Sequence, residues 1–157
     1  MKYVVLVLLA LAVFFYSRYS NNKDSAAAVE NVAIGQDFLT QNKAVEDVVE
    51  TASGLQYQIV ERGNGTEHPT ANSKVTVHYH GTLLDGTVFD SSVDRDKPIS
   101  FGLNQVIRGW TEGVQLMVVG DKFKFFIPSI LGYGDKAAGK IGPGSLLTFE
   151  VTLLEIQ

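Results

Sequence analysis

Two histidines and a pair of serines are the first side chains to consider for chemistry. His78 and His80 alternate on one predicted strand face, a geometry compatible with a metal ion, but His68 lies in a predicted loop and no carboxylate converges on the pair. Ser91 and Ser92 follow a carboxylate but lack the Gly-x-Ser-x-Gly elbow of a hydrolase. The 157 residues include no cysteine. We therefore predict no metal, no cofactor and no covalent nucleophile.

The aromatic residues give a stronger indication. Most of those beyond residue 54 belong to the predicted core. Trp110 differs because it opens the one helix predicted in this region, directly after Val106 and Ile107. Backbone N–H groups at the start of a helix have no partner within the helix. An indole in this position can form the floor of a pocket, with backbone donors beside it.

Short strands around one helix must position these residues. Four strands, each with one buried face, are predicted where apolar and polar residues alternate, over residues 55–59, 75–79, 123–127 and 147–153. The Asp-Gly pair at 85–86 predicts a hairpin turn, with a further strand returning over 88–90. Residues 106–117 predict a helix with Trp110 on its apolar face. The pattern indicates an α+β domain whose helix covers an antiparallel sheet.

A long glycine-rich segment separates Pro128 from Ser145. Loops of this length in a small domain are usually functional or disordered. Tyr133 and Ile141 supply two apolar groups in this loop that must pack against the domain. We therefore treat both as candidate site residues.

Composition restricts the classes of partner. The chain is 45% hydrophobic and 19% charged, which is typical of a folded protein. Its net charge of −4 lacks the basic excess of a nucleic-acid-binding protein, so we predict no nucleic-acid partner.

Residues 1–19 are predicted to target the chain to a membrane. The uncharged apolar run over 3–16 has the length of a signal-peptide core and is shorter than the ~20 residues of a comfortable membrane span. No small-residue cleavage site directly follows it, which favours an uncleaved anchor with the C-terminal domain facing the periplasm or exterior. The alternative is a soluble periplasmic protein released by cleavage.

Residues 20–53 are predicted to be a linker followed by a helical stalk. Residues 20–25 are polar and indicate a solvated connector. Apolar residues recur at three- and four-residue steps over 26–49, a helical pattern that Gly35 interrupts. This helix either packs on the main domain or forms a homodimer interface through residues 26–50, and the sequence leaves both interpretations open.

Five motifs follow one another through residues 54–157. They are Val77-His-Tyr79-His-Gly81, Gly86-Thr-Val-Phe89-Asp90-Ser91-Ser92, Gln105-Val-Ile107-Arg-Gly109-Trp110-Thr-Glu-Gly113-Val, Gly132-Tyr133-Gly134 and Leu147-Thr-Phe149-Glu-Val-Thr-Leu-Leu154. Together they resemble the FKBP-type peptidyl-prolyl cis-trans isomerases. The stalk's Phe38-Leu-x-x-Asn42 is similar to bacterial members with N-terminal helices, several of which are extracytoplasmic dimers. The resemblance implies a five- or six-stranded antiparallel sheet wrapped around one short helix and preceded by a helical segment.

The same resemblance implies an apolar pocket between sheet and helix, with the indole as its floor. The residues it assigns to catalysis are Tyr79, Phe89, Asp90, Trp110, Tyr133 and Phe149. Those it assigns to substrate binding are Ile99, Phe101, Gln105, Val106, Ile107 and Ile141. The Ile107 N–H and the Tyr133 hydroxyl would bond substrate carbonyls. Asp90 would pair with Tyr79 or Arg95 at a polar edge.

The activity implied is rotation of X–Pro bonds in unfolded or partly folded polypeptides that contain proline, with a macrolide such as rapamycin as inhibitor. The alternative is a non-catalytic proline-peptide-binding module or chaperone that uses the same pocket. Ile99 stands where many members have phenylalanine, and residues 135–140 form a short segment with alanines. These departures bear on macrolide affinity and sequence preference. A small-ligand carrier is disfavoured, because so small a sheet leaves no room for a lumen.

Overall fold

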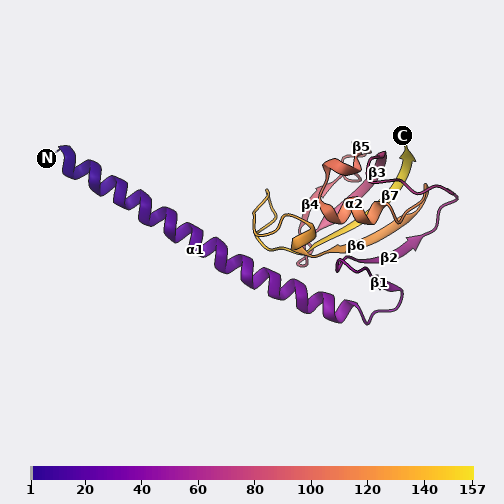
Figure 1. The fold of residues 1–157 in the computed structure, drawn as a ribbon, viewed down its shortest axis with the longest axis horizontal. Helices are drawn as coiled ribbons and strands as arrows, with labels where there is room; N and C mark the ends of the chain where they lie inside the picture. Colours follow the sequence, from indigo (N-terminus) through magenta and orange to yellow (C-terminus); the bar gives the residue numbers. More distant parts are fainter. Residues whose placement is uncertain (1) are drawn as a thin grey trace.

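The computed structural model describes residues 2–157, apart from the side chains of residues 2–12, 14 and 15. One long helix, α1 (Lys2–Asn42), leads into a domain that contains a sheet and a second, short helix, α2 (Arg108–Val114) (Figure 1). The strands are β1 (Val48–Glu50), β2 (Gln56–Glu61), β3 (Lys74–Thr82), β4 (Val88–Ser91), β5 (Ile99–Gly102), β6 (Lys122–Ile127) and β7 (Leu147–Ile156). Two 3-10 turns, η1 (Leu103–Gln105) and η2 (Ser129–Leu131), complete the described elements.

Every strand pairing is antiparallel, and the sheet has the order β1-β2-β6-β7-β3-β4, with β5 also paired to β3. The predicted α+β class, a sheet around one short helix, is confirmed. The sheet has seven strands and not the expected five or six, because β1 and β5 join the four strands predicted from alternation and the one predicted from the hairpin turn. Strand β3 has three neighbours, β4, β5 and β7, so it brings their side chains to one place.

The inner face of the sheet packs against α2. Trp110, Val114 and Met117 are buried there, as their spacing predicts. The helix lies close to the sheet because two of its residues lack a side chain. A Cβ on Gly109 would lie 2.6 Å from Ile127 Cγ2, and one on Gly113 would lie 2.6 Å from Phe125 Cε1. The short helix therefore acts as a thin cover over the strands.

The predicted hairpin forms where the Asp-Gly pair indicates it. Gly86 has φ of +88°, which a residue with a side chain rarely adopts. The Leu83 N–H donates to the Thr87 carbonyl, and Thr87 N–H donates to Asp85 Oδ1. This turn returns β4 beside β3 and brings Asp90 level with Gly81.

The outer face of the sheet carries a second apolar cluster, covered by the C-terminal part of α1. Leu39, Phe126 and Leu146 are buried there, and the rings of Phe38 and Phe126 lie 5.6 Å apart between centroids. Gln56, predicted to face outward to solvent, is instead fully buried beneath α1. Its amide nitrogen donates to the Leu39 carbonyl and its oxygen accepts from Asn42. Two arrangements were expected for this helix, and the structure contains one of them, the packing of the helix on its own domain.

Three predictions for the N-terminal third were wrong. Residues 20–25 are helical and not a linker, because no proline or capping turn interrupts α1 there. Gly35 does not divide the helix, because it lies against Leu146, whose Cβ would be 3.2 Å from an added Cβ. Residues 45–49 leave the helical pattern and form a turn and β1. Val48 and Val49 pair with β2 at the edge of the sheet.

In the part of the chain that the structure describes, no helix meets the length and hydropathy of a membrane span. The anchor predicted over 1–19 lies mostly outside the described side chains. Of the apolar run, Val13 and Tyr16 are described, and both are exposed on α1.

Candidate active site

One cavity of about 450 Å³ lies between α2, the sheet and the loops at one end of the domain. Every predicted site residue except Phe89 and Ile141 lines it, namely Tyr79, Asp90, Ile99, Phe101, Gln105, Val106, Ile107, Trp110, Tyr133 and Phe149. They come from β3, β4, β5, η1, the start of α2, the loop after η2, and β7. The fold therefore collects residues that are far apart in the sequence.

Aromatic rings form the interior of this cavity. The Trp110 indole is 5% exposed, and the rings of Tyr79 and Phe149 stand at 83° and 85° to it, with centroids 5.3 and 5.1 Å away. Phe101 lies at 5.3 Å on another side. Edge-to-face contacts of this kind stabilise aromatic clusters beyond their buried area. The indole Nε1 is buried and makes no hydrogen bond in the described residues, while the ring faces supply apolar contact.

Phe89 and Ile141 occupy different positions from those predicted. Phe89 stands behind the cavity wall, edge-to-face with Phe149 at 5.2 Å and 86°. Ile141 is 5% exposed and belongs to the main core cluster, where its backbone pairs with Ala138. Phe89 supports the wall through Phe149, Ile141 belongs to the core, and neither lines the cavity.

Gly81 is a residue that the sequence reasoning missed. A Cβ there would lie 2.7 Å from Phe89 Cζ and 2.8 Å from Phe149 Cε1, so the two rings occupy the space a side chain would take. A glycine inside an alternating strand indicates such a close approach, and this signal was available in the sequence. Gly81 therefore allows the edge-to-face pair that supports the wall.

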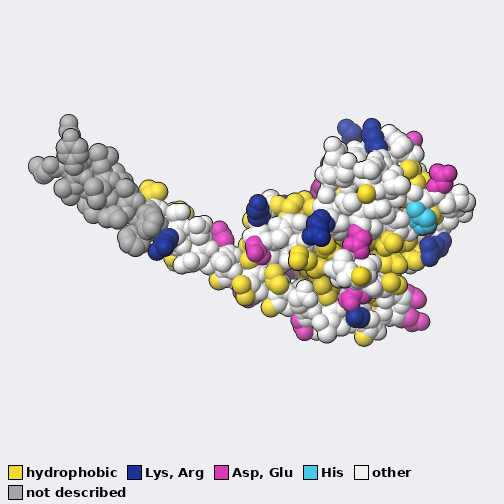
Figure 2. All heavy atoms as spheres, in the orientation of Figure 1, with side chains coloured by type: hydrophobic (Ala, Val, Ile, Leu, Met, Phe, Trp, Pro, Cys, Tyr) yellow, Lys and Arg dark blue, Asp and Glu magenta, His cyan; other side chains and the backbone are white. Residues whose placement is uncertain are grey.

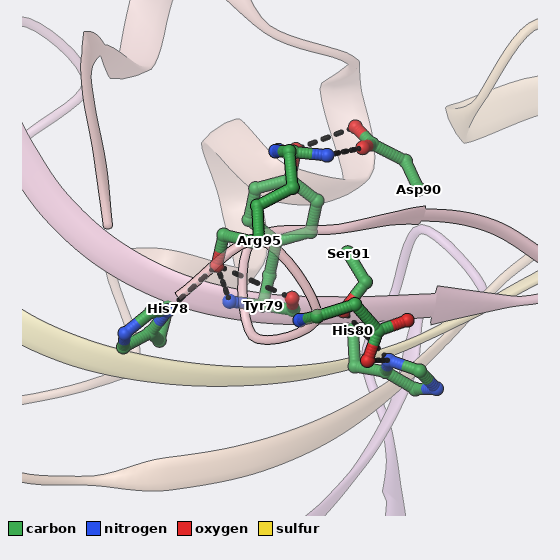
Figure 3. A network of polar contacts seen from close by, with 8 residues as sticks. His78, Tyr79, His80, Asp90, Ser91 and Arg95 are labelled. Carbon is green, nitrogen blue, oxygen red and sulfur yellow. Dashed lines mark hydrogen bonds and ion pairs between the residues drawn. The ribbon is translucent and has the colours of Figure 1, made fainter. Parts of the chain in front are cut away.

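A polar edge closes the cavity beside Tyr79. Its hydroxyl donates to Asp90 Oδ2 at 2.5 Å, and Arg95 donates to Asp90 Oδ1 at 2.5 Å and to the Tyr79 hydroxyl at 3.1 Å (Figure 3). The Arg95 guanidinium also lies 6.0 Å from the Tyr79 ring centroid. The predicted partners of Asp90 were alternatives, and the structure contains both contacts. The three groups hold one another in place at the mouth of the pocket.

Titration of these groups follows from their contacts. Burial, and then the hydrogen bond to Asp90, raises the pKa of the Tyr79 hydroxyl. Burial acts to raise the pKa of Asp90, but the hydrogen bonds from Tyr79 and Arg95 together hold it below its ordinary value. The hydrogen bond to Asp90 raises the pKa of Arg95. At neutral pH the edge therefore consists of a neutral phenol between a carboxylate and a guanidinium.

Two hydrogen-bonding groups at the rim are open to a ligand. The Ile107 N–H precedes α2 and donates no hydrogen bond within residues 2–157. Tyr133 is 44% exposed on the loop after η2, and its hydroxyl has no partner among the described side chains. Ile99 is 39% exposed at the opposite rim. The cavity thus has an apolar interior and a few donors at its mouth, as small-molecule and peptide sites usually do.

The two strand histidines bond serines. His78 Nδ1 lies 2.8 Å from Ser92 Oγ, and His80 Nδ1 lies 2.8 Å from Ser91 Oγ (Figure 3). Ser92 Oγ also accepts from the Tyr79 N–H at 2.8 Å. These contacts join β3 to the chain that follows β4. Within the described residues, no cluster of three metal-ligating side chains occurs.

The segment between β1 and β2 is hydrogen-bonded to α2. Thr51 Oγ1 donates to Glu112 Oε1 at 2.6 Å, and Ser53 Oγ donates to Glu112 Oε2 at 2.5 Å. Both contacts join positions about sixty residues apart in the sequence. These hydrogen bonds could not be predicted from sequence periodicity, because a glutamate on the polar face of a predicted helix is expected to contact solvent.

These features define a class of α+β domain with an aromatic cleft suited to a small ring. Comparison with known proteins agrees with this description. Residues 65–154 match the family described as "FKBP-type peptidyl-prolyl cis-trans isomerase". Residues 10–59 match the family described as "Domain amino terminal to FKBP-type peptidyl-prolyl isomerase". The chain therefore belongs to the FKBP-type peptidyl-prolyl cis-trans isomerase family, and the family recognised from its motifs is confirmed.

Individual relatives support the assignment. The chain is 57% identical over 130 residues to the FKBP-type peptidyl-prolyl cis-trans isomerase FkpA of Aeromonas hydrophila, covering 83% of this chain and 48% of that protein. It is 45% identical over 131 residues to the outer membrane protein MIP of Legionella longbeachae, covering 83% and 56%. The crystal structure of FkpA from Escherichia coli matches with a TM-score of 0.87 at 38% identity, covering 96% of this chain and 71% of that one. The chain spans about half the length of the curated relatives it matches.

Proposed function

We propose that this chain catalyses cis–trans rotation of X–Pro peptide bonds in unfolded or partly folded polypeptides, without covalent chemistry. The observation that carries the proposal is the aromatic cavity of about 450 Å³ with the buried Trp110 indole as its floor. A prolyl ring fits such a space and leaves the preceding amide at the mouth. Membership of an isomerase family supports the same activity.

The chemistry required is modest because no bond is broken. The amide resists rotation through its partial double-bond character, with a barrier of ~18–20 kcal/mol. In the twisted transition state this conjugation is lost, and the carbonyl becomes less dipolar than in the planar amide. An apolar cavity therefore disfavours the planar ground state more than the twisted state. A thousandfold acceleration needs only about 4 kcal/mol.

Rim donors supply the remaining part of the mechanism. We expect the Ile107 N–H and the Tyr133 hydroxyl to bond carbonyls on either side of the proline; the support is that both residues line the cavity and neither group has a hydrogen-bond partner among the described residues. Holding these carbonyls fixes the flanking chain while the amide between them turns. The hydrogen bonds of the Tyr79 hydroxyl to Asp90 and Arg95 would hold the Tyr79 ring in a fixed orientation beside a bound prolyl ring.

A proline-limited refolding assay on the full chain tests the proposal. The refolding rate should rise in proportion to the concentration of the chain, and rapamycin should suppress this rise by occupying the same cavity. Saturable binding of a proline peptide with no acceleration of refolding would overturn the enzymatic proposal in favour of the non-catalytic binding module. In neither case is a metal or cofactor added.

We also propose an extracytoplasmic location for the domain, at the membrane surface or in the periplasm. The support is the apolar run over residues 3–16 and the similarity to a protein named an outer membrane protein. Mass spectrometry of the N-terminal peptide from separated membrane and periplasmic fractions tests it. An intact N-terminus in the membrane supports the anchor, and a cleaved one in the periplasm supports release. Recovery in the cytoplasm would contradict both.

Homodimer formation through residues 26–50 is a further proposal about partners. Support comes from apolar side chains that α1 leaves exposed, with Val29 at 70% and Ile34 at 51%. Sedimentation velocity of the full chain across a hundredfold range of concentration should show a concentration-dependent dimer. Replacing Val29 and Ile34 by glutamine should shift it to monomer. A chain that stays monomeric throughout would contradict the proposal.

A further inference from the structure

A second cavity adjoins the aromatic pocket across the Ile107–Arg108 peptide. Its volume is about 500 Å³, and it is lined by Arg108, Thr111, Glu112, Gln115, Leu116 and Leu131. We call it the α2 groove. Ile107 lines the pocket and Arg108 lines the groove, while Leu131 of the groove lies two residues before Tyr133 of the pocket rim. The linings of the two cavities are therefore neighbours along the chain at two places.

The groove carries two opposite charges on one side of α2. Arg108 and Glu112 are four residues apart, so they project from the same face of the helix. Arg108 is exposed and forms no ion pair with any residue that the structure describes. Glu112 is held in place by the neutral hydroxyls of Thr51 and Ser53, which orient its carboxylate and leave its charge uncompensated. Among the described residues neither side chain forms an ion pair, and the partly exposed Glu112 carboxylate keeps its charge although both oxygens accept a hydroxyl.

Their spacing matches an extended polypeptide. Four residues along an α-helix rise about 6 Å, and two residues of extended chain cover nearly the same length, at about 3.3 Å each. Side chains two positions apart in an extended chain also point to the same side. An acidic residue and a basic residue two positions further along can therefore face Arg108 and Glu112 together.

The floor of the groove suits the stems of such side chains. Leu116 and Leu131 supply its apolar lining, against which the methylene groups of long charged side chains can pack. Figure 2 shows Lys, Arg, Asp and Glu side chains next to hydrophobic ones on this face of the domain. Apolar contact with charged ends is the complementarity that an extended dipolar segment requires.

We propose that the α2 groove binds the substrate segment that leaves the proline pocket past Ile107, and that it selects an acidic residue nearer the proline and a basic one two positions further from it. This inference rests on the proposed isomerase function. It adds a subsite for residues flanking the proline and names Arg108 and Glu112 as its specificity-determining residues. Substrates with the reversed order of charges place like charges together and are disfavoured.

A peptide series tests the proposal on the full chain. The peptides have one X–Pro bond and differ only in two flanking positions, spaced by two, which carry Glu then Lys, Lys then Glu, or two glutamines. The series is made on both sides of the proline. On the side that occupies the groove, kcat/KM for the peptide with its acidic residue nearer the proline should exceed that for the reversed peptide about tenfold at low ionic strength. The ratio should shrink as salt screens the charges.

Charge-reversal variants assign the effect to the groove. Exchanging the two charges in an Arg108→Glu, Glu112→Arg variant should invert the preference. Arg108→Gln alone should reduce the ratio to about threefold. The matched control, Lys23→Gln, also removes one positive charge but lies on α1 far from the groove, and should leave the ratio unchanged.

The outcomes separate this inference from the proposed function. Equal rates for all three peptides on both sides of the proline would overturn the α2 groove and leave the isomerase intact. A preference that persists in the charge-exchanged variant would overturn it as well. Absence of isomerisation for every peptide and in the refolding assay would overturn the proposed function itself.

Discussion

The two faces of the sheet use aromatic residues in opposite ways. On the inner face, Trp110, Tyr79 and Phe149 stand edge-to-face and border an open cavity. On the outer face, Phe126 packs against Phe38 and is 6% exposed, because the long α1 covers it directly. The difference lies in what covers each face. The seven residues of α2 cover the inner face only in part and leave space at their N-terminal end, whereas α1 covers Phe126 completely.

Replacing one ring on each face is the strongest way to break this comparison. Trp110→Ala should lower kcat/KM about a hundredfold, which corresponds to ~2.7 kcal/mol, because the floor under the prolyl ring is lost. Phe126→Ala should lower the free energy of unfolding by about 3–5 kcal/mol through the cavity it leaves, with kcat/KM unchanged. Steady-state kinetics and urea unfolding measure the two effects.

The tryptophan variant also loses core packing, so Trp110→Phe is made in parallel. It retains an aromatic floor and should fold, with a kcat/KM loss smaller than that of alanine. If folded Trp110→Ala keeps full activity, the aromatic residues of the inner face serve only as core packing, as those of the outer face do, and the assignment of the pocket as the active site is wrong.

Two glycines sharpen the comparison. Gly81→Ala should reduce kcat/KM about tenfold and destabilise the fold by about 1–3 kcal/mol, because the new methyl displaces Phe89 and Phe149. Gly35→Ala gains up to ~1 kcal/mol of helix propensity on α1 against a 3.2 Å contact with Leu146, so stability should change little and kcat/KM not at all. Thermal unfolding measures the stability change of both variants, and steady-state kinetics measures their kcat/KM. Equal effects on activity would show that the wall needs no close approach at Gly81.

The charge at the polar edge should have a moderate effect. Asp90→Asn should lower kcat/KM about fivefold, or roughly 1 kcal/mol of transition-state binding, because the carboxylate that orients Tyr79 and Arg95 is lost.

The pH dependence of stability follows from the same carboxylate. The pKa of Asp90 is held below its ordinary 3.8, so its charge stabilises the fold fully above pH 3.8, and this contribution disappears as pH falls through the lower native value. The difference in unfolding free energy between the native chain and Asp90→Asn should therefore be constant from pH 5 to 7 and shrink below pH 3.8. A difference that grows on acidification would contradict the assignment.

The smallest effect on catalysis is expected from the buried polar pair on the outer face. Asn42→Ala removes the donor to Gln56 Oε1, and a buried acceptor without a partner costs about 1–3 kcal/mol. Catalysis should not change. Gln41→Ala is the control, since its amide bonds Asp37 on the exposed side of α1 and its loss should cost only a few tenths of a kcal/mol. Equal destabilisation by the two variants would mean that the buried pair carries no special weight.

The sequence predicted the inner face well because its signals are local. Alternation marks β3, β6 and β7, and the helical spacing of Trp110, Val114 and Met117 marks α2. The family motifs then name the residues that line the cavity. Their strands meet because β3 pairs with three neighbours, and a single sequence does not encode this pairing in any local pattern.

The outer face could not be predicted because its burial depends on a distant element. Gln56 reads as a solvated strand residue until α1 covers it. The positions of Phe89 and Ile141 depend on how Gly81 and the loop after η2 fold, which places Phe89 behind the cavity wall and Ile141 in the core. The length of α1 is similarly hidden, since polar residues 20–25 suit a connector and an exposed helix equally.

The bonds of Thr51 and Ser53 to Glu112 have a mechanical consequence. Together with the packing of α1 from Ala28 to Asn42, they restrict rotation of this helix relative to the cleft. The part of α1 before Ala28 projects from the domain (Figure 1) and, at 1.5 Å per residue, extends about 40 Å. Any contact that fixes the first turns of α1 therefore also sets the distance and the orientation of the cleft relative to that contact.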